Sequence, residues 1–415
     1  ALPSLSIAIN PDDFYGASGI YQHPKSEGER WERAISVELL TKDGTEKGFQ
    51  VDSGMRIQGG SSRNTDIPKH SFSLRFRKEY GSGKLNYPLF KNSPYGETAV
   101  QKFDYLQLRG GFNFGWTHRH YYQSKHAQYN RDQFANDVFL AMGNYGIHGR
   151  WTHLYINGLY WGIYHIHERP DADFMNAYFG EKELSYDAIN SSSATNGSIA
   201  SYNKMVTVAS KLVSSPQEYE NLKKHLHIES FIDYMILNFY IGNRDWDGHN
   251  WRAAGNGPSG EPFRFFPWDS EFALSPNNAG AIQSPNPISN ALLTDVTNKN
   301  GNQRPTGIHQ KLKNNNWYRL KFADHIRKHL FNGGPLSPEG SNTIWKKRPD
   351  SLEMAIIAES ARWGDFRRDV DAGRWSPSQF DLYTKNNHYK QTQNWIFESY
   401  FPNRTDILLD QLRLR

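Results

Sequence analysis

Hydrophobic and polar residues alternate along much of the N-terminal part of the chain, as they do in strands that bury one face. Residues 5–9 and 34–40 show this alternation, and two further stretches follow within residues 151–167. Those two stretches flank Asn157-Gly158, a dipeptide that favours a two-residue β-hairpin turn. We therefore expect a β-rich lobe over residues 1–167.

In the second part of the chain, apolar residues recur at helical spacing. They do so from Ile228 to Phe239, and Gly242 stands where helices commonly end in a glycine. This pattern predicts a mainly helical lobe over residues 168–415, and therefore an α+β fold for the whole chain. Other helices are expected over 118–142, 318–330, 340–363 and 389–415, and one more should begin at Ser215-Pro216. Loops are expected over 189–202, which is rich in Ser and Asn, and over 275–290, which is rich in Pro, Asn and Gly.

Composition narrows the classes of protein. A chain of 415 residues is long enough for two lobes, and its net charge of +5 comes from basic residues mixed with acids, so no nucleic-acid-binding stripe is expected. The chain has no cysteine, which excludes disulfides and thiolate chemistry. It has no apolar run long enough for a membrane span. The polar, Asn- and aromatic-rich composition favours an exported or surface protein of a bacterium.

The candidate chemistry gathers in the segment that follows the predicted helix at 228–239. It reads NRDWDGHNW and, after a Gly- and Pro-rich turn, FPWDSEF. With the turn centred near residues 259–260, Asn250 and Asp269 would lie opposite each other, with Cβ atoms about 4.5–5.5 Å apart. Asp245, Asp247 and Glu271 would converge with them at the same end of the hairpin. An all-oxygen cluster of this kind suits Mg²⁺ or Mn²⁺ better than zinc.

Two enzymatic chemistries fit such a cluster. Phosphoryl transfer needs an aspartate to orient the nucleophile and an Asn with an Asp to hold metal, and Asp245 and Asn250 have the five-residue spacing of a kinase catalytic loop. Glycoside hydrolysis would instead use Asp245 or Asp247 together with Asp269 or Glu271 as two carboxylates across the sugar bond.

Two other interpretations of the cluster remain open. A calcium loop fits poorly, because Gly248 comes too early and Asn256 stands where a glutamate is needed. The acids could also be structural, as turn caps or as ion-pair partners of Arg244 and Arg252.

A second candidate site lies in the N-terminal part, at Gly59, Gly60, Ser61 and Ser62. Glycines let a backbone approach a phosphate, and exposed N–H groups can cradle an anion, although no GK[ST] follows to make a P-loop. Lys69 opens the next expected strand, close to this turn. The alternatives are a plain hairpin turn and a solvent-exposed lysine.

Several segments together carry a family resemblance. NRDWDGHNW followed by FPWDSEFAL, RIQGGSSRNTDIPKHSFSLRF, and YINGLYWGIYHIHERPDADFM resemble the corresponding segments of the CotH family, atypical protein kinases first known from spore coats. The resemblance runs from about Leu5 to Arg415. It implies an atypical two-lobed protein-kinase-like fold, with a nucleotide-binding lobe over 1–167 and a catalytic lobe over 168–415. It further implies ATP, Mg²⁺ or Mn²⁺, and a Ser/Thr protein as the acceptor.

The resemblance also implies roles for individual residues. Asp245 would orient the acceptor hydroxyl and accept its proton, while Asn250 and Asp269 would bind the metal. Lys69, with the turn at Gly59, Gly60, Ser61 and Ser62 over it, would contact the phosphates. Glu168 would lie at the hinge, beside the adenine.

One feature departs from ordinary protein kinases, in which a helical Glu pairs with the phosphate lysine. No Glu occurs between Glu97 and Glu168, so Asp132 and Asp137 are the acids on offer as partners of Lys69. Two rival functions also stay open: a carbohydrate-active hydrolase, and a non-catalytic surface or coat scaffold with a decayed nucleotide site.

Overall fold

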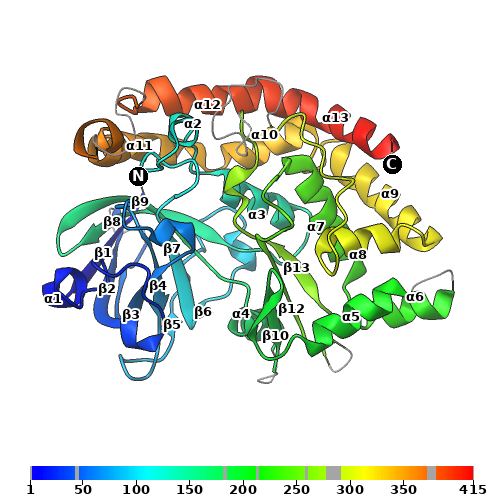
Figure 1. Ribbon diagram of the computed structural model, residues 1–415, viewed down its shortest axis with the longest axis horizontal. Coiled ribbons are helices and arrows are strands. Elements are labelled where there is room, and N and C mark those ends of the chain that lie inside the picture. The colour runs from blue at the N-terminus through cyan, green and yellow to red at the C-terminus, as the bar shows by residue number, and fades with distance from the viewer. Residues whose placement is uncertain are drawn as a thin grey trace. The chain divides into compact units, whose positions relative to one another are not determined.

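The computed structural model describes residues 2–42, 46–180, 185–211, 215–257, 260–276, 291–371 and 380–414. The chain divides into two compact units (Figure 1). Unit 1 contains Ala1–Tyr129, His148–Arg169 and Arg348–Gln393, and unit 2 contains Asn130–Ile147, Pro170–Lys347 and Asn394–Arg415.

Unit 1 is built around a closed barrel in the strand order β1-β2-β3-β4-β7-β9-β8. Neighbouring strands are antiparallel except β1 and β8, whose parallel pairing closes the barrel. The predicted β-rich N-terminal region is therefore confirmed, whereas its closure into a barrel was not predicted. The barrel strands are β1 (Ser4–Ile9), β2 (Arg33–Leu40), β3 (Phe49–Gln58), β4 (Ser71–Arg75), β7 (Tyr105–Arg109), β8 (Gly149–Ile156) and β9 (Leu159–His167), with β5 (Leu85–Asn86) and β6 (Lys102–Phe103) forming a separate pair.

The alternation in the sequence becomes the barrel interior. Ile7, Val37, Met55 and Leu74 come from four successive strands and belong to one buried apolar cluster. The predicted Asn157-Gly158 turn is also confirmed, since β8 and β9 flank it and both turn residues have positive φ, as a type I′ turn requires.

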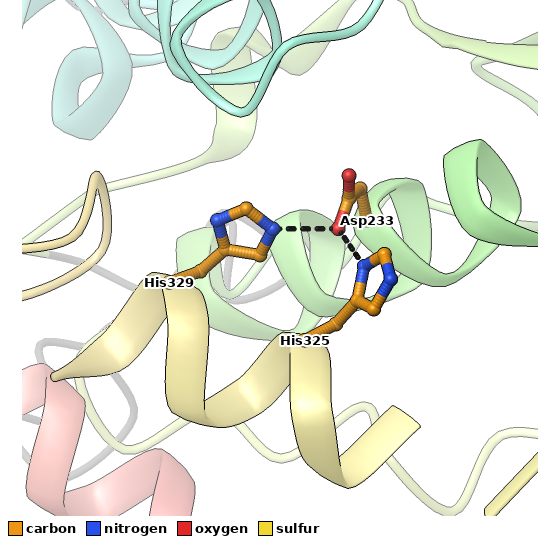
Figure 2. Close-up of side chains that lie close together, drawn as sticks. All are labelled: Asp233, His325 and His329. Carbon is orange, nitrogen blue, oxygen red and sulfur yellow. Dashed lines mark hydrogen bonds and ion pairs between the residues drawn. The ribbon is translucent and has the colours of Figure 1, made fainter. Parts of the chain in front are cut away.

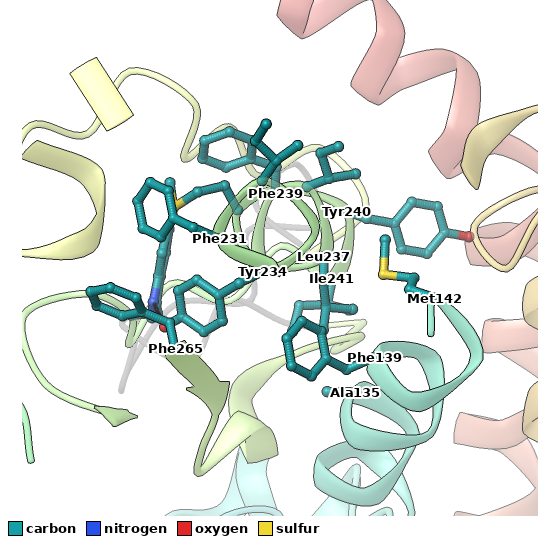
Figure 3. Packing of buried hydrophobic residues seen from close by; sticks show 14 of the residues in the cluster. Ala135, Phe139, Met142, Phe231, Tyr234, Leu237, Phe239, Tyr240, Ile241 and Phe265 are labelled. Atoms are coloured by element: carbon teal, nitrogen blue, oxygen red, sulfur yellow. Dashed lines mark hydrogen bonds between the residues drawn. The ribbon is translucent and has the colours of Figure 1, made fainter. Parts of the chain in front are cut away.

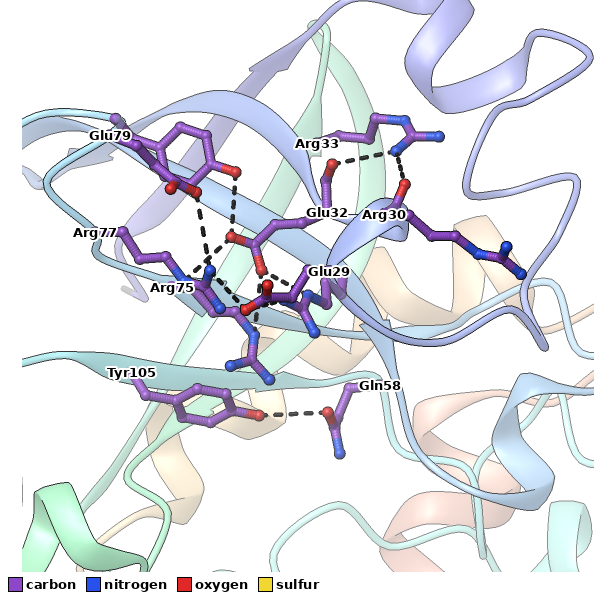
Figure 4. A network of polar contacts seen from close by, with 11 residues as sticks. Glu29, Arg30, Glu32, Arg33, Gln58, Arg75, Arg77, Glu79 and Tyr105 are labelled. Carbon is purple, nitrogen blue, oxygen red and sulfur yellow. Dashed lines mark hydrogen bonds and ion pairs between the residues drawn. The ribbon is translucent and has the colours of Figure 1, made fainter. Parts of the chain in front are cut away.

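Outside the barrel, a buried acid ties the β2, β3 and β4 region together (Figure 4). Glu32, just before β2, receives a 2.5 Å bond from Arg56 Nε of β3 and a 3.1 Å bond from the Tyr80 hydroxyl. Arg75 and Arg77 lie 3.6 and 3.5 Å from the same carboxylate. Because the Glu32 side chain is only 3% exposed, these cations supply the compensation that burial of its charge requires.

A C-terminal segment also belongs to unit 1. Helix α11 (Pro349–Trp363) packs along β9, and Trp363 and Arg362 donate hydrogen bonds to the backbone carbonyls of Trp161 and Tyr160. The remaining helices of unit 1 are α1 (Pro11–Tyr15), α2 (Tyr121–Lys125) and the helical turns at Phe366–Val370 and Lys385–Tyr389.

Unit 2 is organised around α7 (Ile228–Ile241), the helix predicted from its apolar spacing. Figure 3 shows aromatic side chains of α7 meeting Phe265 on one side and the residues of α3 on the other. Its sheet has the order β11-β10-β12-β13. Besides α7, unit 2 contains α3 (Arg131–Ala141), α4 (Ala172–Phe179), β10 (Asp187–Asn190), β11 (Ser193–Asn196), α5 (Ala200–Ser210), α6 (Pro216–Lys223), β12 (Trp251–Gly255), β13 (Arg264–Pro267), α8 (Pro305–Leu312), α9 (Asn316–Leu330), α10 (Pro338–Lys346), the helical turn at Ile396–Tyr400 and α13 (Phe401–Arg413). Helix α12 (Lys390–Trp395) begins in unit 1 and ends in unit 2.

Three local predictions were wrong. The expected helix over 118–142 is two helices, α2 and α3, because Ala127 and Tyr129 between them enter the core of unit 1 whereas α3 enters that of unit 2. The expected loop over 189–202 contains strands, because buried Ile189 pairs with β12 and this pairing outweighs the local preference for turns. The expected helix over 340–363 is broken before Pro349.

Two further sequence expectations concern loops and membranes. The loop predicted over 275–290 lies, from residue 277 onward, outside the described residues. Among the helices of the described ranges, none has the length and apolarity needed to cross a membrane.

The β8–β9 hairpin contains a β-bulge at Trp161, because Leu154 pairs with Gly162 whereas Tyr155 pairs with Tyr160. Beside the bulge, Gly162 has a φ of 119°, and Glu359 and Trp363 lie where a side chain would stand. An added Cβ would meet Glu359 Oε2 at 2.6 Å, so Gly162→Ala should lower the free energy of unfolding by about 3 kcal/mol, measured by urea denaturation.

A matched control lies in the same hairpin. Gly158 also has positive φ, but a Cβ there meets nothing within 4 Å. Gly158→Ala should therefore lower the free energy of unfolding by only about 1–2 kcal/mol, the strain of a left-handed backbone in alanine. Equal losses in the two variants would show that contact with Glu359 is not what excludes a side chain at residue 162.

Candidate active site

The loop after α7 carries the first group of predicted site residues. Helix α7 ends at Gly242, which is left-handed with a φ of 59°, and the chain turns there into Asn243–Asn250. Asp245 Oδ2 accepts a 2.7 Å hydrogen bond from Asn250 Nδ2, and Asp245 Oδ1 lies 2.6 Å from His249 Nε2. The structure therefore brings Asp245 and Asn250 together, and it leaves the amide oxygen of Asn250 as the atom of that side chain able to coordinate a cation.

Asp247 points away from this pair. Its Oδ2 accepts hydrogen bonds of 2.9 and 2.7 Å from the backbone N–H and the hydroxyl of Thr306. Thr306 lies in the first turn of α8, so Asp247 satisfies an N–H at a helix N-terminus, where a negative charge is favourable. Asp247 is 3% exposed and has a structural role.

Lys299, which no sequence pattern singled out, contacts this loop from a distant part of the chain. Its Nζ donates to the carbonyl oxygens of Arg244, at 3.0 Å, and Trp246, which stand on either side of Asp245. Burial lowers the pKa of Lys299, and the nearby carboxylates of Asp247 and Asp245 oppose that change. No local motif marks this lysine, because the contact spans more than fifty residues of chain.

The predicted hairpin is present, but its register was wrong by one residue. Trp251 pairs with Pro267, so the position opposite Asn250 is Trp268, not Asp269. The composition of the turn does not fix how many residues it holds, and a change of one residue alters every pairing. Asn250 lies one residue before this last pair and Asp269 two residues after it, so both stand just beyond the end of the ladder.

Both predicted metal ligands have unusual backbones. Asn250 and Asp269 have φ angles of 62° and 57°, in the left-handed region that is rare for residues other than glycine. Such conformations persist where the surroundings hold them, and they cluster at functional sites. The oxygen donors of Asp245, Asn250 and Asp269 fit the preference of Mg²⁺ and Mn²⁺ for hard ligands.

The first turn of α3 holds the segment after Asp269. Asp132 Oδ1 accepts a 2.7 Å hydrogen bond from the backbone N–H of Ser270, and the Arg131 guanidinium lies 3.5 Å from the carbonyl oxygen of Glu271. Arg131 is fully buried, and this burial lowers its pKa to about 9 against the opposing effect of Glu271. Asp132 thus positions the backbone next to Asp269.

Lys69 forms a buried ion pair in unit 1. Its Nζ lies 2.5 Å from Glu359 Oε1 and donates a 2.8 Å hydrogen bond to the carbonyl oxygen of Ile163. Glu359 also accepts hydrogen bonds from the Ile163 N–H, at 2.7 Å, and from the Tyr129 hydroxyl, at 3.3 Å. Both side chains of the pair are 1% exposed, so Lys69 is not a solvent lysine.

The partner acid of Lys69, which the sequence leaves undecided, is therefore Glu359 rather than Asp132 or Asp137. Asp132 is bonded to Ser270, and Asp137 accepts a 2.7 Å hydrogen bond from Gln133 Nε2. Burial lowers the pKa of Lys69, and the charge of Glu359 opposes this shift. A sequence signal for Glu359 did exist, because it lies on the apolar stripe of α11 that includes Leu352, Ile356 and Trp363.

The glycine turn at residues 59–62 is tightly built. Gly59 has a φ of 127°, and a Cβ there would clash with the Ser62 hydroxyl, so glycine is required. Ser61 and Ser62 begin a short helical turn, whose Ser62 carbonyl oxygen lies 2.9 Å from His70 Nδ1. Around Gly60 there is open space, which leaves that stretch of backbone approachable.

Glu168 is buried and engaged. Its Oε2 accepts a 2.9 Å hydrogen bond from the backbone N–H of His148 and lies 2.9 Å from the Nδ1 of the same residue. Its carboxylate thus joins the start of β8 to the end of β9.

The Lys69–Glu359 pair gives a second prediction. Removing one partner leaves an uncompensated buried charge, so Lys69→Met and Glu359→Gln should each lower the free energy of unfolding by about 3–5 kcal/mol in urea. The double variant should lose clearly less than the sum of the two, because it buries no isolated charge.

The exposed pair Lys84–Asp104, in the same unit, is the control. Lys84→Met should cost at most about 1 kcal/mol. A strictly additive double variant would contradict the assignment of Lys69 and Glu359 as an energetic unit.

Comparison with known proteins identifies the family of the chain. A search of curated proteins gives no match. A family model described as CotH kinase protein matches residues 55–398, which covers the glycine turn, Lys69, the Asp245–Asn250 loop, Asp269 and Glu359. Since the match extends over most of the 415 residues, the chain belongs to the CotH kinase family.

Proposed function

We propose that this protein is an ATP-dependent phosphotransferase that uses Mg²⁺ or Mn²⁺ and transfers phosphate to a Ser/Thr hydroxyl of a protein. Membership of a kinase family supports a transferase with a nucleotide and a divalent metal. The observation that carries the proposal is the contact between Asp245 and Asn250, two residues with the spacing of base and metal ligand in kinase catalytic loops. A two-lobed kinase-like organisation, with lobes over 1–167 and 168–415, is part of this proposal.

Asp245 is assigned the role of orienting the acceptor hydroxyl and accepting its proton. Its side chain is 27% exposed, whereas Asp247 is buried and committed to Thr306. The exposed acid is the one that a substrate hydroxyl can reach. Its bonds to Asn250 and His249 fix the direction of the carboxylate before the acceptor arrives, which lowers the entropic cost of reaction.

Asn250 and Asp269 are assigned to the metal. A divalent cation bound there would neutralise the negative charge that the phosphoryl group carries in the transition state. The bond from the Ser270 N–H to Asp132 holds the backbone next to Asp269, and the left-handed backbones of Asn250 and Asp269 are of the kind that cluster at functional sites.

Lys69, with the turn at residues 59–62, is assigned to the nucleotide phosphates. The pair of Lys69 with Glu359 corresponds chemically to the Lys–Glu pair that active protein kinases hold in place. Because Lys69 is only 1% exposed, its Nζ must exchange one present contact for a phosphate oxygen. Glu168 remains assigned to the adenine side, although its carboxylate is engaged with His148.

The family connection also bears on location. CotH proteins are a spore-coat family, so we propose an exported or surface location and a surface protein as the acceptor. The hydrolase alternative needs two available carboxylates, and the commitment of Asp247 to Thr306 argues against both of the pairs that would use Asp247.

Calorimetric titration with ATP, with and without Mg²⁺ or Mn²⁺, tests the site. Asp269→Ala should abolish metal-dependent binding, whereas Asp245→Ala should keep binding and lose turnover by at least about 1,000-fold. Asp410→Ala, an exposed acid on α13, should change neither. Absence of ATP binding by the wild type in either metal would overturn the proposal, and ATP labelled at the γ or the α phosphate distinguishes phosphoryl from adenylyl transfer.

Lys299→Met tests the loop that carries Asp245. Loss of the two bonds to the Arg244 and Trp246 carbonyls should loosen the loop and lower turnover about 10-fold to 100-fold, with ATP affinity changed less than threefold. Lys321→Met, an exposed position on α9, is the matched control. Unchanged turnover in Lys299→Met would show that these bonds do not position Asp245.

A further inference from the structure

Three side chains from two helices of unit 2 converge away from the Asp245 loop. Asp233 lies in α7, and His325 and His329 lie one turn apart on the same face of α9 (Figure 2). Asp233 Oδ1 lies 2.6 Å from His325 Nδ1 and 2.7 Å from His329 Nε2. One nitrogen of each imidazole and one carboxylate oxygen all lie within 4.8 Å of one another.

This cluster is largely buried, and an outer hydrogen bond orients its carboxylate. Asp233 is 4% exposed and His329 is fully buried, whereas the His325 side chain is 14% exposed. The second carboxylate oxygen, Oδ2, accepts a 2.9 Å hydrogen bond from Asn144 Nδ2, which fixes the direction of Oδ1. Outer hydrogen bonds of this kind commonly orient metal ligands.

The buried carboxylate needs a cation. Within the described part of the chain, its ion-pair partners are the two histidines, and neither Lys nor Arg pairs with it. Burial raises the pKa of Asp233, but the hydrogen bonds from His325 and His329 outweigh burial and lower it to about 2. The Asp233 carboxylate thus lies at a point where two imidazole nitrogens meet.

We propose that Asp233, His325 and His329 form a binding site for a transition-metal ion of the Zn²⁺ class. Two imidazoles with one carboxylate are a ligand set of Zn²⁺, Ni²⁺ or Cu²⁺ and not of Mg²⁺, which prefers oxygen. The ion would replace the protons now shared between the rings and Oδ1, with bonds of about 2.0–2.2 Å to the three donors. A tetrahedral ion with such bonds holds its donors about 3.3 Å apart, so the two imidazole nitrogens must each move away from Oδ1 by about 0.6–0.7 Å. Water on the partly exposed side of His325 would complete the four ligands.

A metal ion at this site would stabilise the packing of α7 against α9. Helix α7 leads through Gly242 directly into the loop of Asp245, so an ion shared by α7 and α9 would brace the helix from which that loop departs. Because the three residues form no part of the proposed nucleotide site, this inference does not rest on the proposed function.

Metal titration of chelator-treated, nucleotide-free protein tests the site. The wild type should bind one Zn²⁺ tightly and gain thermal stability, and Co²⁺ in its place should give the visible absorption of a tetrahedral site. Asp233→Asn and His325→Gln should each weaken Zn²⁺ binding at least about 100-fold and remove the gain in Tm.

Two controls keep the result specific. Asp324→Asn changes an exposed acid next to His325 and should leave Zn²⁺ affinity unchanged. The chain has 16 histidines, so the criterion is loss of one tight site rather than of all Zn²⁺ binding. Circular dichroism establishes that each variant is folded. Equal Zn²⁺ affinity of the wild type and folded Asp233→Asn, or the absence of a tight site in the wild type, would overturn the proposal.

Discussion

The complete burial of α7 is the constraint on which the rest of unit 2 depends. Every residue from Ile228 to Ile241 except Glu229 is buried, and a helix that is covered on all sides has its axis and rotation fixed by its neighbours. Its end is equally fixed, because Gly242 is left-handed and a Cβ there would lie 2.4 Å from the Ala291 carbonyl oxygen. The polar loop that follows therefore starts from one position and in one direction.

Buried charge is the complementary constraint. Asp233, Asp247 and Glu359 are acids at 5% exposure or less, and each accepts at least two hydrogen bonds from named donors. A buried carboxylate without such donors would cost several kcal/mol, about as much as a small domain's whole margin of stability. Asp245 differs, since it keeps 27% of its side chain exposed while both oxygens are directed by neighbours. An acid that is both oriented and accessible is suited to chemistry.

What the sequence could predict was local. Alternation and the Asn157-Gly158 turn identified the β8–β9 hairpin, and apolar spacing with Gly242 identified α7, because each of these signals is complete within a few residues. Barrel closure depends instead on β1 meeting β8, about 150 residues later in the chain, and no local pattern encodes that parallel pair. The register error at Asn250 has the same origin, since composition marks a turn but not its length.

The contact of Lys69 with Glu359 joins residues 290 positions apart, so no local motif can predict it. The sequence does mark one of the two partners, because Glu359 is a charged residue among the apolar positions of α11, as Asp233 is in α7. A charge at such a position must have a partner in the core, whichever segment supplies it.

The same contact bears on how a buried lysine could serve a phosphate. Glu359 accepts from the Ile163 N–H and the Tyr129 hydroxyl as well as from Lys69, so its carboxylate keeps two donors when Nζ moves away. Burial lowers the pKa of Lys69 and the charge of Glu359 opposes this shift, so an anion beside Nζ favours the charged amine. In the proposed site a phosphate oxygen would be such an anion. Exchange of one negative partner for another would cost far less than the loss of either, so burial of Lys69 is compatible with its proposed role as a phosphate ligand.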